Sequence, residues 1–76
     1  MGATLPVMSG RDAVATFGKL GWVLARQRGS HVVMVKEGEI ATLSIPNHAE
    51  LAKGTLRSLI RSAVMTLEQF VAAARR

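Results

Sequence analysis

WVLARQRGSHVVMVKEGEIATLSIP, residues 22–46, contains the clearest structural signal in the chain. Strand-forming residues in this stretch are interrupted twice, by Gly29-Ser30 and by Glu37-Gly38, and both pairs are typical of hairpin turns. The pattern predicts strands over about 22–27, 31–36 and 39–45, the last ended by Pro46. Strands that follow one another through tight turns form an antiparallel meander.

A helix is predicted on the N-terminal side of these strands. Ser9 and Asp12 have the spacing of a capping box, in which the Ser9 hydroxyl accepts a hydrogen bond from a free backbone N–H. Gly21 supplies a left-handed stop. We therefore expect a helix over about residues 10–20, with apolar residues at helical spacing at Ala13, Val14, Phe17 and Leu20.

The C-terminal side is also predicted to be helical. Gly54 and Thr55 open a segment whose apolar face is formed by Leu56, Leu59, Ile60 and Ala63. A second capping box, Thr66 to Gln69, indicates two helices or one helix broken near Met65. The order α-β-β-β-α predicts an α+β domain over residues 1–76, with both helical regions on one face of a three-stranded antiparallel sheet.

Composition limits the class of protein. The chain has 76 residues, no cysteine and a net charge of +5. Its apolar runs are too short to span a bilayer, and its N-terminal residues do not resemble a secretion signal. We therefore expect a cytoplasmic protein with no membrane association. The positive charge favours a polyanionic partner, with nucleic acid first and an acidic protein second.

The side-chain alternation of the strands predicts where His31 points. If Glu37-Gly38 is a two-residue loop, Val32 and Met34 lie on the apolar face with Leu43, and His31 lies opposite Ser44 on the face away from the helices. An imidazole exposed there can act as acid or base near neutral pH.

The first turn leaves two possibilities. A two-residue turn at Gly29-Ser30 places Arg26 and Arg28 on the His31 face. A three-residue turn places Gln27 there instead, and we favour it because it buries Trp22 and Leu24 in the core.

Residues 26–31, RQRGSH, combine groups that a phosphodiester reaction needs. Arg26 and Arg28 can bind phosphate, the Gly29-Ser30 turn can expose N–H groups, and His31 can transfer a proton. A solvated hairpin with a surface histidine contains the same residue types. When residue type is the only criterion, this structural interpretation is favoured over a phosphodiester site.

Other polar residues have less specific patterns. His48 is a second candidate acid or base, but a structural role ahead of the predicted second helix, capping or loop closure, is favoured for it. A basic stripe on the predicted second helix, and Lys36 at the end of a strand, are candidate phosphate contacts; the stripe consists of Lys53, Arg57 and Arg61. A solvated helix face explains the stripe equally well. The acidic residues lack metal-ligand spacing, so we expect no metal site and no cofactor.

Together, these residues resemble the HicA toxin family over nearly the whole chain. The resemblance is carried by Leu5-Pro6, Ser9-Gly10, Gly21-Trp22, residues 26–31, Pro46 with His48, and Gly54-Thr55-Leu56. Many relatives carry an aromatic residue shortly after Gly-Ser-His, where this chain has Val33 and Met34. A stacking role in that strand is therefore not expected here.

The resemblance implies a fold similar to the double-stranded-RNA-binding domain and an endoribonuclease that cleaves mRNA. It implies His31 as the catalytic residue and an antitoxin of the HicB family as the inhibitory partner. An alternative is a non-catalytic RNA-binding module of the same fold, which would tolerate loss of His31.

Overall fold

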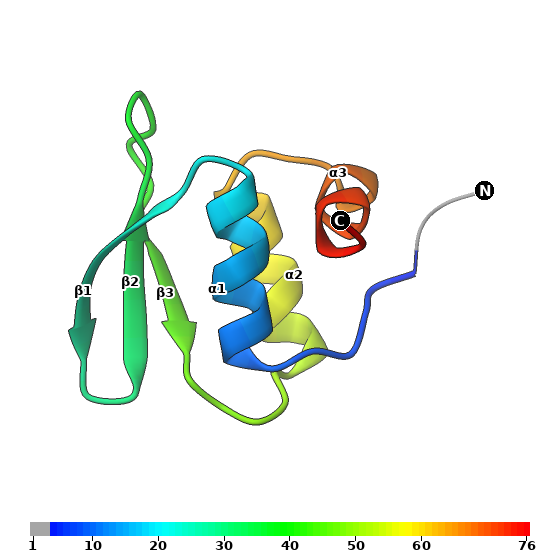
Figure 1. Cartoon of the computed structure of the whole chain (residues 1–76), viewed down its shortest axis with the longest axis horizontal. Helices are drawn as coiled ribbons and strands as arrows, with labels where there is room; N and C mark the ends of the chain where they lie inside the picture. The colour runs from blue at the N-terminus through cyan, green and yellow to red at the C-terminus, as the bar shows by residue number, and fades with distance from the viewer. Residues whose placement is uncertain (1–3) are drawn as a thin grey trace.

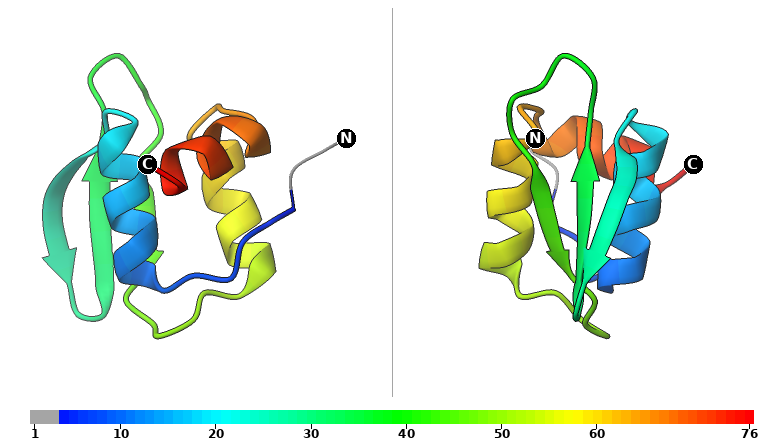
Figure 2. Two further views of the ribbon diagram at one scale, coloured as in Figure 1. Left: turned by 45° about the vertical axis from the view of Figure 1, so that its right-hand side comes forward. Right: turned by 90° about the vertical axis from the view of Figure 1, so that its left-hand side faces the viewer.

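The computed structural model describes residues 4–76 and contains three strands and three helices. Their order is α1 (Gly10–Lys19), β1 (Val23–Arg28), β2 (His31–Val35), β3 (Leu43–Pro46), α2 (Lys53–Ser62) and α3 (Leu67–Ala74). The strands form one antiparallel sheet in the order β1-β2-β3 (Figure 1). The helices lie behind this sheet, and its other face is open (Figure 2, right). The predicted α+β class and α-β-β-β-α order are confirmed, and the C-terminal region is two helices.

The core lies between the sheet and the helices. Phe17 of α1 and Phe70 of α3 are fully buried, and their ring centroids are 5.0 Å apart at a tilted angle. Burial of each large apolar side chain contributes about 1.5–3 kcal/mol. The sheet contributes its alternate residues, and α2 contributes the predicted apolar face; these residues are Val32, Met34, Leu43, Ile45, Leu56, Leu59, Ile60 and Ala63.

The helix boundaries follow the signals in the sequence. Ser9 Oγ accepts a hydrogen bond from Asp12 N at 3.0 Å, and Gly21 has a φ of 99° just after α1. Thr66 and Gln69 form a complete capping box at the start of α3. No helix within residues 4–76 has the length and apolar character needed to cross a membrane.

The predicted connection between β2 and β3 is wrong. Glu39 N donates to Lys36 O at 3.0 Å, so a tight turn does form at Glu37-Gly38, but only Gly38 in this turn has a positive φ, 88°. This pattern matches a type II turn, which splays the flanking strands instead of continuing their twist. The ladder therefore begins only at Leu43, with Leu43 opposite Met34.

This difference moves the register by two residues and leaves the faces unchanged. His31 lies opposite Pro46, not opposite Ser44, and Ser44 lies opposite Val33. Val32 and Met34 are buried, as predicted, and His31 is exposed.

The favoured three-residue turn before His31 is also wrong. Arg28 pairs directly with His31, which leaves Gly29 and Ser30 as a two-residue turn with a φ of 58° at Gly29. A β-bulge between Leu24 and Arg26 then shifts the alternation of β1 by one residue. Because of this bulge Trp22 is buried even though Arg26 and Arg28 face away from the core, while Leu24 stays 57% exposed.

The start of α1 packs directly against the loop after β3. Gly10 N donates to His48 O at 2.9 Å, and a Cβ on Gly10 would lie 2.0 Å from Pro46 O. Gly10 is therefore required by close backbone approach. Gly18, on the same helix, has nothing within 4 Å of its Cβ position.

These two glycines provide a matched test of the packing. Gly10→Ala should lower the free energy of unfolding by about 1–3 kcal/mol because backbone atoms must move to admit the methyl group. Gly18→Ala should raise it by about 0.5–1 kcal/mol because alanine favours the helix. Urea unfolding followed by circular dichroism measures both. Equal stability of the two variants would contradict the contact between α1 and the loop.

Candidate functional site

His31 lies in a surface pocket on the open face of the sheet. It is the first residue of β2 and is exposed. The pocket has a volume of about 430 Å³ and is lined by residues from all three strands and the β2–β3 loop. We call it the His31 pocket; its lining residues are Arg26, Arg28, His31, Val33, Thr42 and Ser44.

The strand register orders these side chains across the sheet. Arg28 pairs with His31, and the next outward-facing row contains Arg26, Val33 and Ser44. Cations therefore form the β1 side of the pocket, the imidazole stands on the central strand, and hydroxyls form the β3 side. Val33 is only 5% exposed and forms the floor.

The polar groups of the His31 pocket are available to a ligand. Within residues 4–76, the side-chain hydrogen bonds involve other residues and none of these polar side chains. Arg26 and Arg28 are exposed, and the chain carries a net charge of +5. The pocket can therefore attract an anion, hold it by two guanidinium groups and place it beside an imidazole.

Comparison with known proteins identifies the family. Residues 10–65 match the family described as HicA toxin of bacterial toxin-antitoxin, a span that runs from α1 through α2 and includes the whole His31 pocket. This chain belongs to the HicA toxin family.

One solved structure supports the same assignment. A chain of a toxin–antitoxin complex from Streptococcus pneumoniae is 34% identical, with a TM-score of 0.68. The match covers 76% of this chain and 98% of that chain. No curated protein matches the sequence.

In this HicA family member, His48 lies at the same end of the sheet as His31. Asn47 N donates to Ser30 O at 2.6 Å, so the loop after β3 contacts the Gly29-Ser30 turn. The His48 carbonyl receives the α1 hydrogen bond, and its side chain is exposed. The backbone carbonyl of His48 therefore helps to close the loop, and this contact leaves the role of its imidazole open.

Lys36 is not brought together with His31. It follows the opposite end of β2, and its Nζ donates to Leu20 O at 3.0 Å, which ties the strand to the end of α1. The aliphatic stem of Lys36 also covers Gly21. This side chain stabilises the fold at a distance from the pocket.

The basic stripe of α2 is also separate from the His31 pocket. Lys53, Arg57 and Arg61 are exposed on α2, which belongs to the helical layer behind the sheet. Arg57 and Arg61 border a different cavity, of about 340 Å³, together with Leu5, Ile60, Met65 and Leu67.

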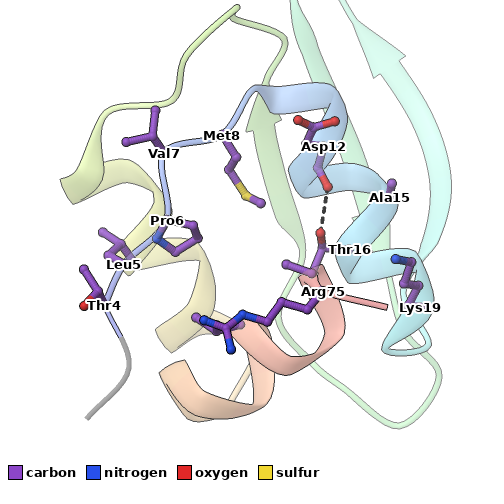
Figure 3. Close-up of a pocket in the computed structure, with 12 residues that line it drawn as sticks. Thr4, Leu5, Pro6, Val7, Met8, Asp12, Ala15, Thr16, Lys19 and Arg75 are labelled. Atoms are coloured by element: carbon purple, nitrogen blue, oxygen red, sulfur yellow. Dashed lines mark hydrogen bonds between the residues drawn. The ribbon is translucent and has the colours of Figure 1, made fainter. Parts of the chain in front are cut away.

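A larger cavity, of about 620 Å³, lies where residues 4–8 pass over α1 and α3 (Figure 3). Asp12, Lys19 and Arg75 are its charged residues. Thr16 Oγ1 donates to Asp12 O within this wall. None of the residues of the His31 pocket line this larger cavity.

Sequence reasoning did not assign Thr42 and Ser44 to the site. Side-chain alternation predicts Ser44 on the His31 face, and Thr42, two residues earlier, shares that face; this was the available signal. In the structure Ser44 enters the pocket opposite Val33, and Thr42 enters it from the end of the β2–β3 loop.

Proposed function

We propose that this HicA family toxin is an endoribonuclease that cleaves mRNA, with His31 as its catalytic acid or base. The observation that carries the proposal is the His31 pocket, where an exposed imidazole shares one surface with two arginines. The proposal places the protein in the cytoplasm, where mRNA is found.

The proposed reaction is attack by an RNA 2′-hydroxyl on the adjacent phosphate. The 2′-oxygen loses its proton and bonds to phosphorus, the bond from phosphorus to the 5′-oxygen breaks, and that oxygen takes up a proton. The products are a 2′,3′-cyclic phosphate and a free 5′-hydroxyl. His31 performs one of the two proton transfers, and His48 or water performs the other.

The arginines support the phosphorus centre in this scheme. Charge on the non-bridging oxygens increases as the phosphorane forms, and preorganised cations stabilise that state more than the ground state. Arg28 is paired with His31 across the β1–β2 ladder, so the same backbone pairing fixes the positions of both residues.

An antitoxin of the HicB type is the proposed protein partner. The Streptococcus pneumoniae relative was solved as a toxin–antitoxin complex, which supports this assignment. A partner that covers the open sheet face would block the His31 pocket and would meet its positive charge with acidic residues.

Loss of the His31 imidazole should abolish toxicity. Expression of the wild-type protein without its antitoxin should stop bacterial growth, whereas folded His31→Ala should be harmless. Removal of one positioned acid or base lowers the cleavage rate by about 10²- to 10⁴-fold. Growth curves and purified-enzyme rates measure this effect, with unfolding midpoints as the control for folding.

Full toxicity of His31→Ala would contradict the catalytic role. RNA binding without any cleavage by the wild-type protein would instead support the RNA-binding module. His48→Ala identifies the group that performs the second proton transfer. A large loss of cleavage rate assigns this transfer to His48, and an unchanged rate assigns it to water.

The products should be independent of added divalent metal. With two guanidinium groups to balance the charge of the phosphorane, cleavage in excess chelator should proceed and leave a 2′,3′-cyclic phosphate. Mass spectrometry of the 3′ ends checks the product. Complete loss of activity in chelator, restored by magnesium or manganese, would contradict the single-histidine mechanism.

Salt dependence should separate the two basic surfaces. For a tetranucleotide, Arg26→Ala with Arg28→Ala should lower the log–log salt slope of the affinity by about 0.7 unit per lost phosphate contact. The triple alanine variant of Lys53, Arg57 and Arg61 should change the slope only with long RNA that extends onto α2. Fluorescence anisotropy measures both. If the α2 variant keeps the wild-type salt slope with long RNA, the basic stripe does not contact RNA.

A further inference from the structure

The two sides of the His31 pocket carry different chemical groups, a difference that the proposed reaction does not by itself require. Its β1 side carries two guanidinium groups, and its β3 side carries the Thr42 and Ser44 hydroxyls. Neighbouring strands are about 4.8 Å apart, so Arg26 and Ser44, which share a row with Val33 between them, stand about 10 Å apart across the sheet. Thr42 precedes Ser44 by two residues and extends the hydroxyl side along β3.

This arrangement fits one nucleotide lying across the strands. The phosphate belongs on the β1 side, because guanidinium groups bind phosphate oxygens well. The sugar edge then lies over β2, within reach of the imidazole. The base is directed to the β3 side, where the pocket presents hydroxyls over the buried Val33.

Hydroxyl groups are suited to reading the edge of a base. Each one both donates and accepts a hydrogen bond, and neither Thr42 nor Ser44 uses its hydroxyl within residues 4–76. An unpaired base suits this contact best, because the deep, narrow major groove of an RNA duplex keeps side chains away from the base edges and its minor groove is recognised mainly by shape.

We propose that Thr42 and Ser44 form a base-recognition edge of the His31 pocket, which binds one unpaired nucleotide of single-stranded RNA and sets which base is preferred at the cleaved position. This inference rests on the proposed ribonuclease function and names two specificity-determining residues for it. Arg26 and Arg28 hold the phosphate of any nucleotide equally, so affinity and base preference depend on opposite sides of one pocket.

The test measures binding without cleavage. Four single-stranded tetranucleotides, each of one base and with 2′-O-methyl groups that prevent attack, are titrated into the wild-type protein. We expect affinities that differ among the bases by about threefold to tenfold, the range for one or two hydrogen bonds. Thr42→Val with Ser44→Ala should bring the four affinities together, because both changes remove a hydroxyl and keep the side-chain size close to the original.

A matched control uses hydroxyls outside the pocket. Ser58→Ala with Ser62→Ala changes two exposed serines of α2 and should leave the base preference unchanged. Arg26→Ala with Arg28→Ala should weaken all four oligonucleotides by the same factor. Equal affinity of wild type for all four bases, or an unchanged preference in the Thr42 and Ser44 variant, would overturn the inference.

Cleavage of ordinary RNA by the same proteins separates this inference from the proposed function. Wild-type cleavage at a preferred base, relaxed in the Thr42 and Ser44 variant, supports both. If cleavage requires His31 but the Thr42 and Ser44 variant keeps the base preference of the wild type, only the base-recognition edge is overturned. Base-dependent binding without any cleavage overturns only the proposed reaction.

Discussion

The alternation of side chains along β2 is the constraint on which the rest of the structure depends. Val32 and Met34 pack into the core with the helices, and their burial forces the alternate residues, His31 and Val33, onto the opposite face. As the central strand, β2 also fixes the neighbours of His31, because it pairs with β1 on one side and with β3 on the other. The position of the candidate catalytic group is therefore a consequence of core packing, and the polar site requires no buried charge.

Much of this fold could be predicted because its signals are local. Capping residues such as Ser9 and Thr66, and glycine stops such as Gly21, act within one helical turn, so the sequence is enough to identify them. The faces of β2 and β3 were also predictable, since they need only a period of two, whereas the bulge in β1 interrupts that period. The β2–β3 register was not predictable, because it depends on whether Gly38 adopts a type II turn or a turn that continues the twist of the strands.

The site was predictable in part for the same reason. His31, Arg26 and Arg28 lie within six consecutive positions on one hairpin, so one short motif contains all three. Their shared face was not predicted, because a three-residue turn was favoured over the two-residue turn that forms. The β-bulge next to Leu24 could not be read from the sequence, and it allows Trp22 to be buried without displacing the arginines. Thr42 and Ser44 reach the pocket through pairing with a separate strand, so no short motif contains them together with the histidine.

The bulge in β1 has a consequence for how the protein behaves among other chains. β1 is an edge strand, and its exposed Val23 and Leu24 would make a regular edge attractive to a second strand. The irregular spacing at the bulge breaks the row of free N–H and C=O groups, and the two neighbouring arginines repel an identical edge. The bulge that turns Arg26 and Arg28 toward the open face therefore also protects the edge of the sheet against aggregation, so that a positively charged surface can remain accessible in a crowded cell.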